Sequence, residues 1–289
     1  MGPTASGKSA MALALAERLD GEIVSADSMQ IYRGLDIGTA KPTPEEQARI
    51  PHHLIDALDI TEPMDASRFV RMADAAIGEI RNRGRNPIVV GGSGLYLKAL
   101  FYGLDDLPPG DPELRKRLEA EFTGTDGAER LRHRVEELDP AAAAKAAGNP
   151  RRLLRALEVR LLTGEPLSAQ QKSPGQLRHP VRAWRLEWNR EVLHQRIEYR
   201  TDQMLRSGWV DEAKALIARG LLETPTARQA LGYSLIAEHL AGKLNCQRLR
   251  EKLSIATRQY ARRQETWFRH QHPEAKLLPM PAKPEALLA

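Results

Sequence analysis

The chain of 289 residues is long enough for one large domain or two moderate ones, and its hydrophobic content of 42% can fill a core. No apolar stretch reaches the length of a membrane span, and the single cysteine, Cys246, excludes an internal disulfide or a cysteine metal cluster. These features make a reducing cytoplasm the default, so we expect a cytoplasmic protein that does not contact membranes. The net charge of +5 is a mild bias toward polyanionic partners.

The first half alternates short apolar runs with helical patterns, which predicts parallel strands joined by helices. Strands are expected over 22–26, 54–57 and 87–90, and a helix with a buried stripe from Phe69 to Ile80 precedes the third of these. Residues 43–46 form a capping box with proline at the first helical position.

The middle of the chain has a different pattern. From 111 to 178 there is no strand signal, and Asp or Asn precedes Pro112, Pro140 and Pro150 as a helix cap would. A strand is expected over 181–188, then helices over 191–206, 210–219 and 244–270, and a frayed tail after Pro279. These patterns predict an α/β core of residues 1–110 and 179–289, with an all-helical insertion at 111–178.

A phosphate-binding loop opens the chain. The pattern G-x-x-x-x-G-K-S is matched by Gly2, Pro3, Thr4, Ala5, Ser6, Gly7, Lys8 and Ser9. Such a loop curls backbone N–H groups around a phosphate, and the helix that follows directs its positive end at the same anion. Lys8 adds a charge for the phosphate oxygens, and the Ser9 hydroxyl can bind Mg²⁺. An ordinary turn before a helix is the less favoured interpretation, because the whole pattern is present.

The position of the acidic residue argues against a plain nucleotide kinase. The strand at 87–90 ends in Gly91-Gly92-Ser93, without the carboxylate that binds magnesium in many such enzymes. An acid instead follows the earlier strand, as Asp27. A helix cap and a functional role in the ligand crevice are equally good interpretations of Asp27 from its position alone.

Eight segments together resemble the tRNA dimethylallyltransferase (tRNA isopentenyltransferase) family. They are GPTASGKS (2–9), SADSMQIY (25–32), GLDIGTAKP (34–42), PHHLID (51–56), VGGSGLYLKAL (90–100), NPRRLLRALEV (149–159), LGY (231–233) and ATRQYARRQETW (256–267). They occur in order over nearly the whole chain. The resemblance implies a P-loop NTPase-like parallel sheet flanked by helices, with a helical insertion domain that contacts tRNA.

The resemblance also implies the reaction and its participants. The phosphate loop would bind dimethylallyl diphosphate with Mg²⁺, and the acceptor would be N6 of the adenosine 3′-adjacent to the anticodon of tRNA. It assigns catalysis to Asp27 as the base, with Thr4, Lys8 and Ser93. It assigns contact with the anticodon stem-loop to Asp27, Ser28, Met29, Gln30, Ser93, Arg115, Arg151, Arg152, Leu153, Leu154, Arg155, Gln229, Arg258 and Arg262.

Elementary chemistry supports these assignments. A carboxylate that accepts a proton from a weakly nucleophilic adenine amine is typically worth ~10²–10⁴ in rate. Arginines at 151, 152 and 155 lie at a helix start, where the helix dipole disfavours them by roughly 0.3–1 kcal/mol each, so a phosphate partner would offset a real cost. A solvated helix face remains the alternative for these arginines.

One departure from the family pattern concerns the first strand. The family has an apolar strand before the phosphate loop, whereas Gly2 here follows Met1 directly. We expect this chain to be poorly stable or inactive and a version extended upstream to be sound. Two further functions stay open, a P-loop small-molecule kinase and a catalytically decayed tRNA-binding protein, and a variant that prenylates free adenylate is close to the preferred one. Nothing in the sequence requires more than a monomer.

Overall fold

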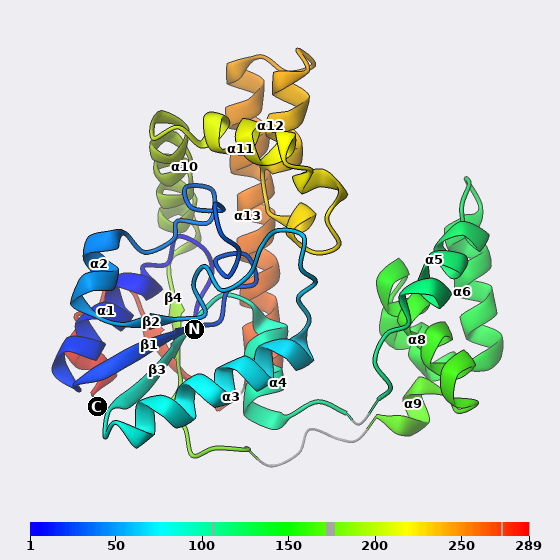
Figure 1. Cartoon of the computed structure of the whole chain (residues 1–289), viewed down its shortest axis with the longest axis horizontal. Coiled ribbons are helices and arrows are strands. Elements are labelled where there is room, and N and C mark those ends of the chain that lie inside the picture. The colour runs from blue at the N-terminus through cyan, green and yellow to red at the C-terminus, as the bar shows by residue number, and fades with distance from the viewer. Residues whose placement is uncertain (106, 172–176, 273, 289) are drawn as a thin grey trace. The chain divides into compact units, whose positions relative to one another are not determined.

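A computed structural model describes residues 1–105, 107–171, 177–272 and 274–288 (Figure 1). The chain divides into two compact units, a core of Met1–Phe101 with Leu177–Ala289 and a helical unit of Tyr102–Gln176. The insertion therefore begins at Tyr102 rather than at Asp111 and ends at Gln176 rather than at Arg178.

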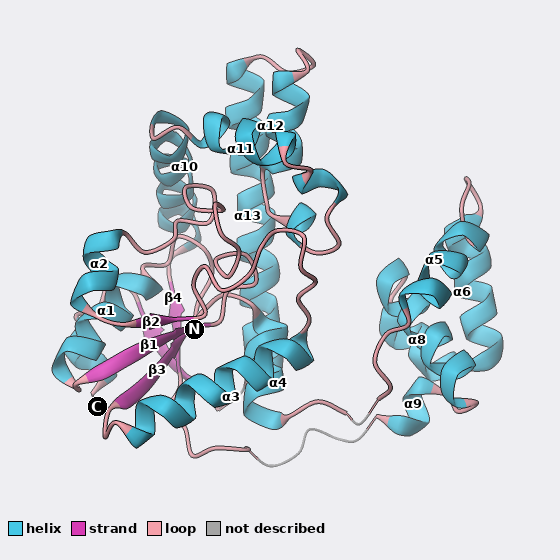
Figure 2. Cartoon of the chain, in the orientation of Figure 1, coloured by secondary structure: helices cyan, strands magenta, loops and turns pink. Residues whose placement is uncertain are grey.

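The core contains the strands and most of the long helices (Figure 2). Its strands are β1 (Gly21–Ser25), β2 (His52–His53), β3 (Asn86–Val90), β4 (Trp184–Glu187) and β5 (Lys276–Pro279). Its α-helices are α1 (Lys8–Arg18), α2 (Pro44–Arg49), α3 (Ala66–Asn82), α4 (Gly94–Tyr102), α10 (Arg190–Arg206), α11 (Trp209–Ala218), α12 (Tyr233–Leu240) and α13 (Cys246–Gln271). Short 3₁₀ helices cover η1 (Leu221–Glu223), η2 (Ala227–Gln229) and η3 (Pro284–Leu287).

The main sheet is parallel, as the alternation of strands and helices predicts. Its order is β2-β1-β3, and Ile23 pairs with Ile88 at its centre. Both α1 and α3 pack against β1 and β3. The face under α1 is apolar, because Ile23 joins Ala12, Leu13 and Ala16 of α1 in one buried cluster. The carboxyl ends of the strands therefore meet beside the start of α1, where open parallel sheets bind ligands.

The predicted strand over 54–57 is wrong. The strand is two residues long and lies immediately upstream, at His52–His53. Leu54 and Asp56 have φ values of 64° and 53°, in the left-handed region that an extended strand cannot contain. The chain therefore turns at the residues where the apolar pattern predicts extension.

The predicted strand over 181–188 is shorter than expected and does not join the main sheet. It is β4, and it pairs in parallel with β5, in register from Trp184 with Lys276 to Glu187 with Pro279. The tail expected to fray after Pro279 is instead ordered, since η3 packs Leu287 into a cluster with Met11 and Leu15 of α1. The carboxyl-terminal segment thus covers the phosphate-loop helix.

Met1 lies beside β4. Its amino group donates to the Trp184 carbonyl at 2.7 Å, and its carbonyl accepts from the Leu186 amide at 3.0 Å. These two bonds follow the pattern of a parallel ladder centred on Arg185. Within the described residues, β3 is paired only with β1.

The helical unit comprises α5 (Pro112–Glu121), α6 (Gly127–Leu138), α7 (Pro140–Ala146), α8 (Pro150–Thr163) and α9 (Leu167–Gln170), and no strand occurs among its described residues. The predicted caps are confirmed: side chains of Asp111, Asp139 and Asn149 accept amide hydrogen bonds at the starts of α5, α7 and α8. A separate core that includes Leu118, Leu131, Val135, Leu153 and Leu157 holds the unit together.

No helix in the described part of the chain is both long and apolar enough to cross a membrane.

Candidate active site

The phosphate loop leads directly into α1. Gly7 caps the helix with φ of 85°, and Ala5 has φ of 61°, so the loop alternates between left-handed and other conformations. Backbones of this kind turn successive N–H groups into a concave surface that binds anions. The amino end of α1 adds the positive end of its dipole at the same place.

Gln264 connects the loop to the turn after β3. Its Oε1 accepts from the Thr4 amide at 2.8 Å, and its Nε2 donates to the Gly92 carbonyl at 2.9 Å. The side chain is buried in α13. One residue of the long carboxyl-terminal helix therefore fixes two loops at the edge of the site.

Lys8 has an unusual electrostatic environment. Burial, with a further contribution from the charge of Arg200, lowers the pKa of the Lys8 ammonium to about 8, although the charge of Asp27 raises it. Its Nζ donates to the Pro3 carbonyl at 3.4 Å. Because burial and Arg200 disfavour the charged form of Lys8, a bound diphosphate would stabilise that form and would itself be held by it.

Arg200 of α10 was not found from the sequence. Burial lowers the pKa of its guanidinium, and the charge of Asp27 opposes that shift. Arg200 and Lys8 thus place two cations near one carboxylate. The available signal was Arg196 and Arg200, four residues apart on one helix face, but only the fold brings that face to the loop.

Asp27 lies just after β1, in a turn that fixes one of its oxygens. Oδ1 accepts from the amides of Met29 at 2.9 Å and Gln30 at 3.3 Å. In the described residues Oδ2 has no hydrogen-bond donor, so it can accept a proton from a ligand. No helix of the described chain begins directly after Asp27, so the helix-cap interpretation is wrong; the side chain organises a turn instead, and its second oxygen remains available for a functional role.

The rest of the turn is held by side chains of the same region. The Gln30 Oε1 accepts from the Ser25 hydroxyl at 3.1 Å, and its Nε2 donates to the carbonyls of Thr39 and Ala40. The Ser93 hydroxyl accepts from the Ser28 amide at 2.9 Å. Gln30 and Ser93 therefore position the turn that carries Asp27.

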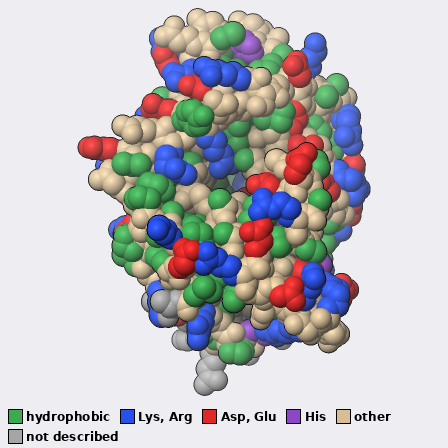
Figure 3. Space-filling view, turned by 90° about the vertical axis from the view of Figure 1, so that its left-hand side faces the viewer, with side chains coloured by type: hydrophobic (Ala, Val, Ile, Leu, Met, Phe, Trp, Pro, Cys, Tyr) green, Lys and Arg blue, Asp and Glu red, His purple; other side chains and the backbone are tan. Residues whose placement is uncertain are grey.

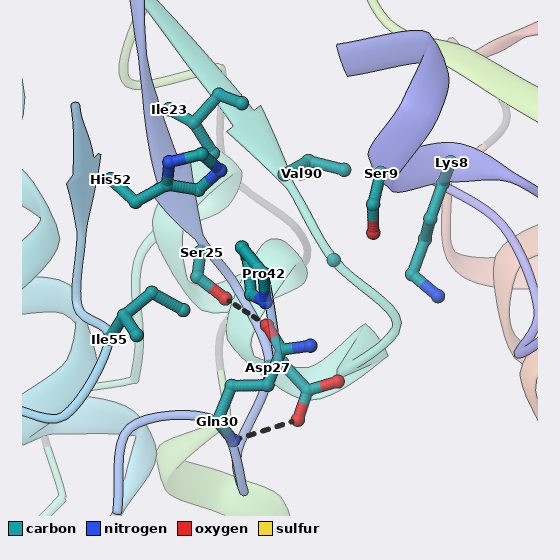
Figure 4. A pocket seen from close by; sticks show the side chains of 11 residues that line it. Lys8, Ser9, Ile23, Ser25, Asp27, Gln30, Pro42, His52, Ile55 and Val90 are labelled. Carbon is teal, nitrogen blue, oxygen red and sulfur yellow. Dashed lines mark hydrogen bonds between the residues drawn. The ribbon is translucent and has the colours of Figure 1, made fainter. Parts of the chain in front are cut away.

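A hollow of about 360 Å³, open to solvent, lies between α1 and the ends of the strands (Figure 4). Figure 4 shows Lys8 and Ser9 on one side and Asp27 with Gln30 on another. Its lining residues are Lys8, Ser9, Ile23, Ser25, Asp27, Gln30, Pro42, His52, Ile55, Val90 and Gly91. The hollow thus combines a cationic side, a carboxylate and an apolar wall, which suits an amphiphilic anion. Thr4 and Ser93 are not among its lining residues.

Close backbone approach explains the glycine after β3. A Cβ on Gly91 would overlap the backbone of Ala26, at the end of β1. Many kinases carry a magnesium-binding carboxylate after this strand, but here the contact with the backbone of Ala26 leaves no room for a side chain at Gly91. This geometry agrees with the argument from sequence against a plain kinase.

The donors for a metal ion are few. No group of three or more His, Cys, Asp or Glu residues in the described chain could enclose a metal. The Ser9 hydroxyl and the Asp27 carboxylate line the same hollow, and such oxygens suit Mg²⁺, which retains several waters in sites of this kind. The residues present therefore fit an ion held jointly with a substrate phosphate.

The four arginines of the helical unit expected to contact tRNA divide into two groups. Arg115 and Arg155 both bind the buried carboxylate of Glu158, at 2.6 and 2.7 Å. Arg151 and Arg152 are exposed at the start of α8, where Arg152 donates to the Lys145 carbonyl at 3.3 Å. Leu153, beside them, is buried in the core of the unit, and Leu154 packs against that core.

The remaining residues expected to contact tRNA lie on the core unit. On α13, Arg258 pairs with Glu198 of α10 at 3.0 Å, and Arg262 is exposed. Gln229 ends η2, where its amide bonds to the Thr226 carbonyl. Figure 3 shows one face of the molecule, on which basic side chains are interspersed with acidic ones.

Comparison with known proteins gives consistent matches. The IPP transferase family profile matches residues 30–271. The tRNA dimethylallyltransferase of Geobacter metallireducens is 48% identical over 93% of this chain and 87% of its own. The tRNA dimethylallyltransferase of Halorhodospira halophila is 50% identical over 94% of this chain and 89% of its own.

Solved structures agree with these sequence matches. The full-length tRNA isopentenylpyrophosphate transferase of Bacillus halodurans has a TM-score of 0.70 and 38% identity, over 99% of this chain and 91% of its own. A eukaryotic dimethylallyltransferase, solved acting on tRNA, has a TM-score of 0.78 and 30% identity, over 96% of this chain and 72% of its own.

Proposed function

The chain belongs to the IPP transferase family, and from this premise we propose that it transfers a dimethylallyl group from dimethylallyl diphosphate to N6 of the adenosine 3′-adjacent to the anticodon in tRNA. One structural observation supports the proposed reaction. Lys8 and Ser9 of the phosphate loop line the same hollow as Asp27, so a diphosphate and an acceptor amine can meet there.

The reaction is a substitution at the first carbon of the prenyl group. The N6 lone pair forms a bond to this carbon, the carbon–oxygen bond breaks, and its electron pair leaves with the diphosphate. The free oxygen of Asp27 accepts the proton that N6 loses, which is worth ~10²–10⁴ in rate for a well-placed base. Asp27 is held for this role by the amides of Met29 and Gln30.

Charge on the departing diphosphate requires stabilisation. The loop amides, the Lys8 ammonium and the Arg200 guanidinium supply it from fixed positions, without the reorganisation that water would need. Ser9, with an oxygen of the substrate, would hold Mg²⁺, which supplies additional positive charge to the leaving group when bound. The apolar wall of Ile23, Ile55 and Val90 is suited to the five-carbon group.

The acceptor base must reach this hollow from a stacked loop. Adenosine would be extruded toward Asp27, as in other enzymes that act on a base. We assign tRNA phosphate contacts to exposed arginines, Arg151 and Arg152 in the helical unit and Arg262 on α13. Arg258, Gln229 and the turn 27–30 are assigned to the same partner. The proposed working form is a cytoplasmic monomer.

The test uses an unmodified anticodon stem-loop with adenosine next to the anticodon, together with protein, Mg²⁺ and dimethylallyl diphosphate. Digestion and mass spectrometry of the nucleosides should reveal prenylated adenosine and release of one diphosphate per product. A stem-loop with guanosine at that position is the matched control and should give none. Product from free adenylate but not from RNA would redirect the proposal to a nucleotide acceptor. Phosphate release from ATP without any prenyl transfer would favour a kinase.

A further inference from the structure

Two adjacent carbonyls of the phosphate loop accept hydrogen bonds from side chains behind it. Arg196 Nε donates to the Ala5 carbonyl at 2.8 Å, and Trp188 Nε1 donates to the Ser6 carbonyl at 2.9 Å. The two donors also contact each other, because the Arg196 guanidinium lies 4.4 Å from the centroid of the Trp188 ring. They reach the loop from α10 and from the residue just after β4.

Because the peptide group is planar, each of these hydrogen bonds orients an amide as well as a carbonyl. The C=O and N–H of one trans peptide point in opposite directions, so fixing a carbonyl also fixes the following amide. The bond from Trp188 turns the Ser6 carbonyl backward and therefore turns the Gly7 amide toward the other side of the loop. The bond from Arg196 fixes the Ala5–Ser6 peptide, whose amide closes the internal turn onto the Pro3 carbonyl at 3.3 Å.

The loop needs external support of this kind. Ala5 has φ of 61°, a conformation that is unfavourable for a residue with a side chain. Its methyl group is buried with Leu193, Ile197 and Ala261, which anchors the loop but leaves peptide rotation to the hydrogen bonds. Trp188 also packs against this cluster, so it combines packing with the hydrogen bond, whereas Arg196 contributes the hydrogen bond to the Ala5 carbonyl.

We propose that Trp188 and Arg196 are positioning residues for the diphosphate, which set the peptide orientation of the phosphate loop without touching the substrate. This inference rests on the proposed function. The same helix face that carries Arg196 carries Arg200 one turn later, so α10 positions the loop backbone and a cation of the site together.

Substitutions can separate positioning from packing. Trp188→Phe keeps an aromatic ring beside the Arg196 guanidinium, and removes the N–H donor together with the volume of the second ring. Trp184→Phe is the matched control, because Trp184 of β4 packs against the Leu186 and Leu278 cluster, which does not include the loop. Arg196→Met removes the other donor and keeps an unbranched stem, and Arg190→Met at the exposed start of α10 is its control.

The measurement is calorimetric titration with inorganic diphosphate and Mg²⁺, with KM for tRNA and the melting temperature measured in parallel. Loss of the oriented Gly7 amide to a charged ligand predicts a dissociation constant about tenfold higher in Trp188→Phe. Arg196→Met should raise the dissociation constant as well, because it releases the Ala5–Ser6 peptide whose amide closes the internal turn of the loop. Because both bonds fix one loop, the double variant should lose less than the product of the two effects. KM for tRNA should not change, since neither residue is assigned to that partner.

The outcomes separate this inference from the proposed function. Equal diphosphate affinities in Trp188→Phe and Trp184→Phe, and in Arg196→Met and Arg190→Met, would overturn the positioning role while leaving the transferase proposal intact. Weaker diphosphate affinity accompanied by an equal rise in KM for tRNA would also overturn it, because a general loss of structure would then explain both changes. A wild-type protein that does not bind diphosphate would overturn the proposed function itself.

Discussion

At the scale of single residues, the site is a balance of two cations against one carboxylate. Lys8 and Arg200 are both partly desolvated, and burial disfavours the charged form of each. The charge of Asp27 opposes this effect in both. The three groups leave an excess of positive charge, to which Mg²⁺ and the loop amides would add, and this is the physical reason to expect the hollow to bind a dianionic or trianionic diphosphate.

The lowered pKa of Lys8 predicts a pH dependence of binding. In the free protein the ammonium titrates at about pH 8, whereas a bound diphosphate would raise that pKa. The contribution of Lys8 to diphosphate affinity should therefore be constant well below pH 8 and fall as pH rises above it, by at most tenfold per unit. Titrations between pH 6 and 9.5 check this. Lys8→Arg, whose guanidinium stays charged, should not show the fall, and an identical fall in that variant would exclude Lys8 as its cause.

Sequence reasoning could predict the residues of the site that lie in local motifs. The phosphate loop and Asp27 are each defined by a few neighbouring residues, and the structure brings Lys8, Ser9, Asp27 and Gln30 to one hollow. Arg200 could not be found in this way. Its role depends on the packing of α10 against a loop nearly two hundred residues earlier, and no local pattern records that contact.

At the scale of elements, a buried carboxylate joins three parts of the core. Glu22 of β1 binds His53 of β2 at 2.6 Å and Arg83 after α3 at 2.7 Å. The hydrogen bond from Arg83 is the main cause that lowers the pKa of Glu22 to about 2, against the effect of burial. The network fixes β2, which has only two residues, beside β1.

Glu22→Gln should therefore destabilise the core. We expect a loss of about 2 kcal/mol at pH 7, below the usual 3–5 for breaking a buried pair because Arg83 is roughly half exposed. The folded pKa is depressed, so this stabilisation is present above about pH 4.5 and is lost as pH falls toward 2. Urea unfolding followed by circular dichroism measures it. The exposed Glu79→Gln on α3 is the control, and equal midpoints for the two variants at pH 7 would contradict the prediction.

The two groups of arginines in the helical unit predict two different phenotypes. Arg152→Ala should weaken tRNA binding and reduce the salt slope by about 0.7–0.9, as expected for one lost phosphate contact, with little change in stability. Arg155→Ala removes one of the cations bound to the buried Glu158, so it should lower the melting temperature of the unit. Binding at several salt concentrations and thermal melts of both variants check this. A large stability loss in Arg152→Ala would contradict the assignment.

Errors in the predicted elements have identifiable physical causes. The strand expected over 54–57 is apolar, but the left-handed φ values of Leu54 and Asp56 make it a turn. The tail after Pro279 looks too rich in proline to fold, yet η3 gains order by packing on α1. The Asp56 amide donates to the Gln30 carbonyl and the Asp56 carboxylate binds Lys41, so contacts with other segments decided the conformation in both cases. The capped helices of the insertion were predictable because their signals are local.

At the scale of the whole molecule, segments from both ends of the chain meet around the phosphate-loop helix. Met1 bonds to β4, β5 pairs with β4, and η3 packs on α1, as the positions of both termini in Figure 1 suggest. Burial lowers the pKa of the Met1 amino group to about 5. A charged amine is therefore unfavourable where a continuing backbone would be neutral.

Strand-forming residues added ahead of Met1 should stabilise the protein. In the register that Met1 sets, five β-branched residues ahead of it would run beside residues 180–184, extend the ladder past the start of β4 and replace the buried amine by a peptide. We expect a rise in melting temperature of about 5 °C, which corresponds to one or two kcal/mol in a protein of this size. Five added Gly and Ser residues provide the control. Equal melting temperatures for the two extensions would contradict the argument.

The account as a whole depends on Asp27 as the base that serves a prenyl transfer to tRNA. Single-turnover reactions with a preformed complex of wild-type or Asp27→Asn protein, diphosphate donor and stem-loop measure this directly. We expect Asp27→Asn to bind both substrates with affinities close to wild type and to form prenylated adenosine ~10²–10⁴ times more slowly. Product formation in Asp27→Asn at the rate of the wild-type protein would contradict the account.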